Sequence, residues 1–240
     1  MKQYKFYDVV MALFVTVLLL SNLLSSAKLI DLHASIGSLD LVFDAGTLVF
    51  PISYIFGDIL TEVYGYERSR RVIWMGFLAM ILMAFFVWLA GALPGLQDWE
   101  EGVGQSAYDA ILGGISGLII ASVIAYWVGE FSNSYVLARM KIATQGRWLW
   151  MRTIGSTLVG QGVDTITFFI IATMLNVFPA SLFFSLVVTN YILKVGIEVL
   201  FTPFTLLVVN VLKRIENEDY YDQQTNFNPF QFGLNQNTDN

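Results

Sequence analysis

The segment Arg68–Leu93 reads RSRRVIWMGFLAMILMAFFVWLAGAL, in which a cluster of arginines precedes a long run without any ionisable side chain. A helix needs ~20 apolar residues to cross the hydrocarbon core of a bilayer, and Val72–Leu93 is long enough to do so. Arginines beside such a run mark the cytoplasmic end of a membrane span. The segment therefore predicts a transmembrane helix that runs outward and, because it lacks ionisable residues, has a mainly structural role.

The same pattern of basic residues recurs along the whole chain. Of the 13 lysines and arginines, all but Lys28 and Lys194 lie in alternate connections between apolar stretches or at the two chain ends. By the positive-inside rule, this alternation predicts an all-α polytopic membrane protein with six transmembrane helices and both termini in the cytoplasm. The expected spans are Asp8–Ile30, Ala45–Tyr64, Val72–Leu93, Ile111–Phe131, Arg152–Val177 and Leu182–Leu212.

Composition supports a membrane protein without a separate soluble domain. Hydrophobic residues make up 56% of the chain and charged residues 13%, whereas a soluble domain carries about 25% charged residues. Residues 1–215 are expected to form one six-helix transmembrane domain. Residues 216–240, which are rich in Asn, Gln and Asp, are expected to form a disordered polar cytoplasmic tail. The connection Ile30–Asp44 is expected to carry a short interfacial helix or hairpin.

The absence of certain residue types excludes several kinds of site. Cysteine is absent, and His33 is the only histidine. Disulfides, thiolate metal sites and histidine-rich metal sites therefore cannot form. We expect neither a metal nor a cofactor.

Ionisable side chains inside the apolar stretches point to function. A charge at the centre of a spanning helix costs on the order of 2.5–3.5 kcal/mol on insertion scales. The deepest such residues are Asp58, Asp164, Lys194 and Glu198. They must pair, take up a proton or line a wet cavity, and intramembrane ionisable residues commonly mark functional sites. A purely structural ion pair, such as Lys194 with Glu198, is the alternative.

The spacing of polar residues places them on shared helix faces. Asn190, Lys194 and Glu198 recur every four residues, as do Tyr54 and Asp58, so each set forms one stripe on a helix. Stripes on several helices can converge on one interior cavity. Carboxylates and amides would suit a flat ligand with paired N–H donors, such as the edge of a guanine, and tyrosine could stack on its ring. The candidate substrate-binding residues are Asn22, Tyr54, Asp58, Gln161, Asp164, Asn190, Lys194 and Glu198.

A second polar group lies near the cytoplasmic ends of the expected spans. It contains Glu62, Glu130 and Asn133, and the neighbouring basic residues include Arg70 and Arg152. We interpret this group as a belt of salt bridges that fixes the helix ends. The roles of Lys28, Glu62 and Glu130 in function are left open.

A family resemblance rests on a distinctive run in the second span. Gly57–Tyr66 reads GDILTEVYGY and is followed by Arg70-Arg71 and Trp74. The chain resembles the queuosine precursor transporter family of the vitamin uptake transporter type over about residues 15–210. Shorter supporting pieces occur in the expected order: Ser21-Asn22 with Lys28, Gln161 with Asp164-Thr165, Asn190-Tyr191 with Lys194, and Glu198 with Thr202-Pro203.

The resemblance implies a fold and a function. The fold would be a six-helix bundle similar to the substrate-binding subunits of energy-coupling-factor transporters. The function would be uptake of 7-deazaguanines (preQ0, preQ1 or queuine) through the bacterial cytoplasmic (inner) membrane without a dedicated ATPase. The expected partners are a small nucleobase-like substrate and membrane lipid, with no nucleic acid. The preferred 7-deazaguanine, the driving force and homodimer formation are left open.

Other functions were weighed against this resemblance. A vitamin-binding subunit that docks on a shared ATPase remains open. Gly114–Gly117 reads GISG, like the serine motif of rhomboid proteases, but that chemistry needs a histidine base in the membrane. Asp58 and Asp164 could mimic an intramembrane aspartyl protease dyad, although Asp58 lacks the further upstream glycine of such proteases. We expect the chain not to be an enzyme.

The topology can be tested with reporters. A reporter fused after Arg214 should lie in the cytoplasm, and one inserted at Glu101 should lie outside, because basic connections stay on the cytoplasmic side. Reporter activity in intact cells measures both. Finding both reporters on the same side would overturn the proposed orientation.

Overall fold

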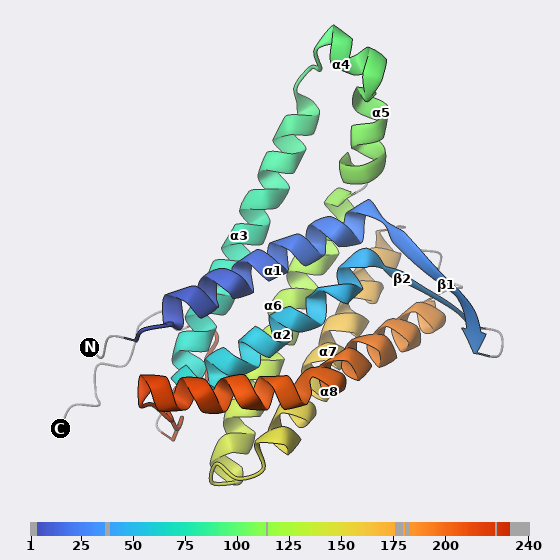
Figure 1. Cartoon of the computed structure of the whole chain (residues 1–240). Coiled ribbons are helices and arrows are strands. Elements are labelled where there is room, and N and C mark those ends of the chain that lie inside the picture. Colours follow the sequence, from blue (N-terminus) through green and yellow to red (C-terminus); the bar gives the residue numbers. More distant parts are fainter. Residues whose placement is uncertain are drawn as a thin grey trace.

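The computed structural model describes residues 4–36, 39–113, 115–175, 180, 183–223 and 225–230. Long helices form a bundle in which α6 and α7 pack along each other and α7 also packs on α8 (Figure 1). The helices of the bundle are α1 Tyr7–Ala27, α2 Phe50–Ile59, α3 Tyr66–Ala92, α6 Ile115–Ala143, α7 Leu149–Met174 and α8 Phe183–Glu216. Four of these helices, α1, α3, α7 and α8, are by themselves as long and apolar as a membrane span requires.

Within the described residues, 5 segments are long and apolar enough to cross a membrane. The predicted helical, polytopic membrane protein is thereby confirmed, whereas the predicted number of six spans stays a prediction. Helix α6 is not among these five, although its 29 residues at ~1.5 Å rise each would reach across a bilayer. The five segments are α1, Ala45–Tyr64, α3, α7 and α8.

Helix α2 and the turns beside it form the central segment of the bundle. It opens with the 3-10 turn η1 Ala45–Leu48, has Pro51 in the first turn of α2, and ends in the π-helical turn η2 Leu60–Tyr64. Proline is favoured at this helix position because its fixed φ suits a helix start. In the most apolar 18 residues of Ala45–Tyr64, 72% of the residues are buried, against 22% in the corresponding parts of α1 and of α3. Neighbouring helices therefore shield the ionisable residues of this segment from lipid.

Several helix ends differ from the predicted ones. Helix α3 begins at Tyr66 rather than at Val72, and α6 continues to Ala143 through residues expected to form a loop. The apolar run marks the stretch that matches the bilayer, whereas a helix can continue beyond it into the polar region. The expected ends at Val177 and Leu182 lie outside the described residues.

The connections at one end of the bundle carry its irregular structure. Strands β1 Leu29–Ile36 and β2 Leu39–Asp44 form an antiparallel hairpin, one of the two forms expected there. Helix α1 ends at Ala27, so Lys28 lies in extended backbone just after the helix rather than inside a span. Figure 1 places this hairpin at the far end of α1 from the N-terminus, and α4 at the far end of α3. The second connection consists of α4 Gln97–Gly102, α5 Gly104–Tyr108 and the π-helical turn η3 Asp109–Gly113.

The opposite end, called here the basic end, holds the start of α1 and the end of α8. The carboxylate of Glu216, at the end of α8, accepts hydrogen bonds from the backbone N–H groups of Lys5 and Phe6 at 2.9 and 2.7 Å. An anion at this position suits the positive N-terminal end of α1. The Tyr7 hydroxyl donates to the carbonyl of Arg68 at 3.1 Å, which ties α1 to the start of α3. The alternate basic connections predicted from the sequence thus meet at one end of the bundle.

Two glycines, one closely packed and one open to its surroundings, give a testable contrast in helix packing. A Cβ atom added at Gly160 would lie 2.6 Å from Cβ of Asn133, whereas one added at Gly196 meets no atom within 4 Å. Gly160→Ala should destabilise the protein by about 1–3 kcal/mol through overpacking. Gly196→Ala should be neutral or stabilising by up to about 1 kcal/mol, because alanine is the better helix former. Thermal unfolding in detergent measures both, and equal melting temperatures would contradict the packing.

Candidate functional site

Polar side chains from three helices meet in the interior of the bundle. Helix α2 contributes Tyr54 and Asp58, helix α7 contributes Gln161 and Asp164, and helix α8 contributes three further residues. Tyr54, Gln161 and Glu198 are 0% exposed, Asp58 is 1% exposed, and Asp164 and Asn190 are 3% exposed. The sequence-predicted stripes on these helices therefore face inward, as ionisable residues in a membrane must. The third stripe, on α8, consists of Asn190, Lys194 and Glu198.

An ion pair joins α7 to α8 within this group. The Lys194 Nζ atom donates to Asp164 Oδ2 at 3.0 Å, and the side chains are 12% and 4% exposed. The same ammonium group lies 4.2 Å from the centre of the Phe50 ring, a favourable cation–π distance. The structural pair of Lys194 with Glu198 considered from the sequence is therefore not the one formed.

Asp58 forms a hydrogen bond to α6 through one of its two carboxylate oxygens. Its Oδ1 atom accepts a hydrogen bond from Asn133 Nδ2 at 2.8 Å, while its Oδ2 atom has no hydrogen-bond partner among the described residues. Asn133 was assigned to the cytoplasmic belt from the sequence, and that assignment is wrong. Because Asp58 and Asp164 each have a separate partner, they do not form the facing pair that an aspartyl protease would need.

Many buried polar atoms in this group lack partners. Within the described part of the chain, both amide atoms of Gln161, both carboxylate oxygens of Glu198 and the hydroxyl of Tyr54 make no close hydrogen bond. The Thr157 hydroxyl nevertheless lies beside the Glu198 carboxyl group. Each buried polar group left unpaired costs about 1–3 kcal/mol, so native proteins keep few of them. The group therefore offers carboxylate acceptors and an amide with both donor and acceptor to a bound polar molecule.

Glu130 of α6 belongs to this interior group, although the sequence placed it in the cytoplasmic belt. Its side chain is 0% exposed, and neither of its carboxylate oxygens has a hydrogen-bond partner within the described residues. It packs against α2, where a Cβ atom added at Gly57 would collide with its carboxyl group. Its carboxyl group lies near those of Asp58 and Asp164. Helical spacing could have linked Glu130 with Asn133, but the predicted span ended at Phe131.

Two predicted site residues bond mainly to their own helices. Asn190 Nδ2 donates to the carbonyl of Leu186 at 3.0 Å, and its Oδ1 atom lies 3.5 Å from the Thr47 hydroxyl. Asn22 Nδ2 donates to the carbonyl of Leu18 at 2.9 Å. Among the described residues, Asn22 makes no hydrogen bond to the interior group, so its place in the site stays a prediction.

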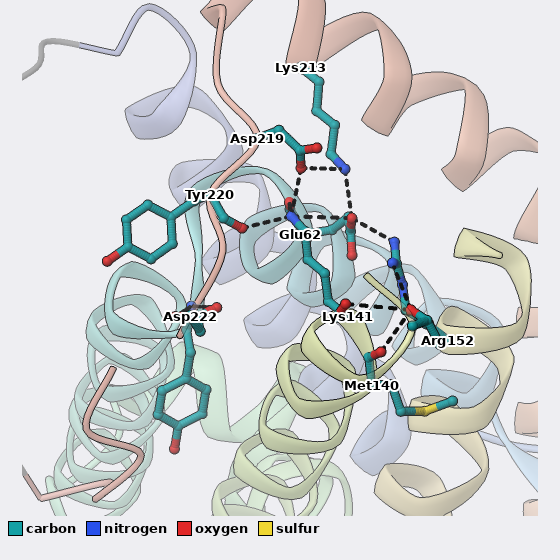
Figure 2. Close-up of polar contacts among 10 residues, drawn as sticks. Glu62, Met140, Lys141, Arg152, Lys213, Asp219, Tyr220 and Asp222 are labelled. Carbon is teal, nitrogen blue, oxygen red and sulfur yellow. Dashed lines mark hydrogen bonds and ion pairs between the residues drawn. The ribbon is translucent and has the colours of Figure 1, made fainter. Parts of the chain in front are cut away.

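A separate charge cluster occupies the basic end, one helical turn beyond Asp58. Glu62 Oε1 lies 2.8 Å from Arg152, 2.6 Å from Lys213 and 3.4 Å from Lys141 (Figure 2). Arg152 comes from α7, Lys213 from α8 and Lys141 from α6, so one carboxylate ties several helices together. The predicted belt is confirmed for Glu62 and Arg152, and Figure 2 adds the two lysines.

Residues expected to form a disordered tail pack against this end. We call residues 217–223 and 225–230 the C-terminal strap. Asp219 Oδ1 lies 2.7 Å from Lys141 Nζ and 2.8 Å from Lys213 Nζ. Arg70 NH1 donates to the carbonyls of Asn226 and Asn228 at 2.7 and 2.9 Å. The strap is thus held by cations and backbone carbonyls, and residues 231–240 lie outside the described residues.

Comparison with known proteins identifies relatives of the chain. Residues 44–208 match the family model described as "Putative vitamin uptake transporter". The chain is 27% identical over 160 residues to the "Probable queuosine precursor transporter" of Bacillus subtilis (strain 168), which covers 66% of this chain and 68% of that protein. It is 26% identical over 177 residues to the "Queuosine precursor transporter" of Escherichia coli (strain K12), covering 72% and 76%. No solved structure matches the chain significantly.

The ion pair between α7 and α8 can be tested without any ligand. Lys194→Met leaves the Asp164 carboxylate buried without its partner, which should cost about 3–5 kcal/mol of stability. The double variant Lys194→Met with Asp164→Asn should recover much of this loss, because no unpaired charge remains. Thermal unfolding in detergent measures the series. A single variant as stable as the parent would show that the pair is absent.

Proposed function

The chain belongs to the vitamin uptake transporter family, and we propose that it imports queuosine precursors (preQ0, preQ1 or queuine) through the interior polar group. The family and the named relatives are transporters, so the chain is a membrane transporter and not an enzyme. The observation that carries the proposal is the set of buried, unpaired acceptors on Glu130, Glu198 and Asp58. Such atoms are satisfied when a ligand brings donors to them.

The chemistry of the substrate matches this group. A 7-deazaguanine is flat and presents a ring N–H beside an exocyclic amino group, two parallel donors that one carboxylate can accept together. Glu198 and Glu130 each offer two free oxygens for this edge. Gln161 can serve both the carbonyl and the N–H groups on the remaining edges. Tyr54, buried beside the ring of Phe50 at 5.5 Å, provides aromatic surface for stacking.

The Asp164–Lys194 ion pair places a positive charge among the carboxylates of the site. Lys194 neutralises one of the interior carboxylates, which lowers the repulsion among the others. Because the pair joins α7 to α8, a substrate that displaces either partner would change how these helices meet. We propose that this coupling connects substrate binding to the opening of the transport path, first on one side of the membrane and then on the other.

The proposed topology extends the described architecture. Residues 1–215 form the transport domain, α6 is the sixth span, and both termini face the cytoplasm of a bacterial inner membrane. The reason is that Arg70, Lys141, Arg152 and Lys213 all lie at the basic end with the start of α1 and the end of α8, and positive residues favour the cytoplasmic side. The resemblance to energy-coupling-factor substrate-binding subunits remains an expectation about the bundle as a whole.

Binding by the interior carboxylates can be measured directly. Glu198→Gln and Asp164→Asn replace an acceptor by a group that also donates, so a two-donor edge loses a partner in a dry site. Each change should weaken binding by roughly tenfold or more, since 1.4 kcal/mol is tenfold and an unpaired donor costs about 1–3 kcal/mol. Thermal shift or calorimetry with a panel of guanine and 7-deazaguanine bases provides the measurement.

The exposed Glu101, in the α4 region, supplies the matched control as Glu101→Gln. Uptake by the purified chain alone in liposomes separates a complete transporter from a subunit that needs an external ATPase. A carboxyl variant that still binds but no longer accumulates substrate would identify the residue that carries a coupling proton. Normal binding and accumulation in both variants would show that the stripes are structural, and the site assignment would fail.

A further inference from the structure

We propose that the C-terminal strap is the cytoplasmic gate of the transport path and that the Glu62 cluster is the lock beneath it. This inference rests on the proposed function, since a gate needs a path from the interior polar group to the basic end. It concerns residues that the substrate site itself does not use.

Glu62 stands between the interior group and the basic end. It follows Asp58 by four residues on the same central segment, so it lies about one turn closer to that end. Its carboxylate binds Arg152 of α7, Lys213 of α8 and Lys141 of α6. These helices and α2 are the ones that carry the interior group. A substrate moving to this end must pass the point where Glu62 holds them together.

The strap covers the same cations from outside. Lys141 Nζ donates to Asp219 Oδ1 and to the carbonyl of Tyr220, both at 2.7 Å, while Lys213 contacts Asp219 at 2.8 Å (Figure 2). The two lysines are therefore shared between Glu62 below and the strap above. Burial disfavours the charged form of Asp219, but the hydrogen bonds and charges of Lys141 and Lys213 outweigh burial and lower its pKa. Asp219 is consequently ionised at neutral pH, as its contacts with the two lysines require.

The far part of the strap is anchored beside the path on α3 and α6. Trp74 Nε1 donates to the carbonyl of Pro229 at 2.8 Å, and the Phe227 ring packs on Tyr66 and Tyr135 at 5.0 and 5.3 Å. The near part leaves α8 at Asn217, whose φ of 48° ends the helix in the left-handed conformation. Residues 218–222 thus run from the end of α8 to an aromatic anchor, with Asp219 over the cluster.

The two layers differ in how easily they open. The side chain of Asp219 is 47% exposed, whereas that of Glu62 is 1% exposed. The side chains of the Asp219 partners Lys141 and Lys213 are 2% and 18% exposed, so each Asp219 pair has one solvent-exposed member. Water can solvate the Asp219 carboxylate when it leaves, which lowers the cost of breaking these contacts. Separating the buried Glu62 from its cations costs far more, because the charges would be left unpaired. The strap is therefore the part that moves first, and the Glu62 layer opens when the helices rearrange.

The absence of cysteine from the sequence makes a direct test available. In the variant Thr157→Cys, the single thiol lies on α7 between Arg152 and Gln161, at a position that is 0% exposed. Inside-out vesicles present the cytoplasmic face to a membrane-impermeant maleimide, and the rate of labelling reports access from that face. The strap is then altered in this background by Asp219→Asn. The neighbouring Glu218→Gln, whose carboxylate accepts a hydrogen bond from Tyr4, is the matched control.

Asp219→Asn should increase the labelling rate by about fivefold, the factor that corresponds to ~1 kcal/mol. Glu218→Gln should leave the rate near that of the parent. Affinity for a 7-deazaguanine should be unchanged in both, since neither residue touches the interior group. An unchanged labelling rate in Asp219→Asn, with or without a lower melting temperature, would make the strap a static structural segment and overturn the gate.

A second variant keeps the test decisive and separates the two proposals. Truncation after Asn217 removes the strap and should raise the labelling rate at least as much as Asp219→Asn. If no variant, including the parent, binds any 7-deazaguanine while Asp219→Asn still labels faster, then the gate stands and the proposed substrate fails. If binding is normal and labelling is unchanged in both strap variants, the gate fails and the proposed function stands.

Discussion

The cost of placing charge inside a bilayer governs this structure. Asp58 and Glu62 lie on one short segment, and a carboxylate facing lipid would be far more expensive than one facing protein. Other helices surround that segment, so that 72% of the residues in the most apolar part of Ala45–Tyr64 are buried. The outer helices can then be almost wholly apolar toward lipid, as residues 72–92 of α3 are. The central position of α2 is therefore a consequence of its acids, and the arrangement of its neighbours follows from it.

The same constraint produces two different solutions at two depths. At the basic end, Glu62 is compensated by Arg152, Lys213 and Lys141, and this compensation makes the helix ends a rigid unit. One turn deeper, Glu130 and Glu198 have no close hydrogen-bond partners among the described residues. A compensated acid stabilises a fold, whereas an uncompensated one stores unfavourable energy that a ligand or a proton can release. The π-helical turn η2 carries Glu62 itself, and such turns often occur at functional sites.

The sequence predicted well whatever depends on a periodic pattern. Apolar runs located the helices because the bilayer fixes their length, and the four-residue spacing of Asn190, Lys194 and Glu198 predicted an inward stripe. Contacts between helices were not predictable in this way. Asp164 and Glu198 were both within plausible reach of Lys194, and only the way α7 packs on α8 selects Asp164. Glu130 was misplaced for a related reason: depth was counted from Phe131, whereas α6 continues to Ala143.

The strap shows a second limit of prediction from sequence, and the contacts that hold it bear on how a gate can open. Its composition indicates disorder, because few of its residues can bury apolar surface. Yet Arg70 and Trp74 bind its backbone carbonyls, which every residue supplies and no composition reveals. Contacts of this kind, together with the Phe227 ring that packs against the apolar core, hold the segment in place. The gate proposed above depends on the polar contacts, because these can break and re-form while the helices stay folded.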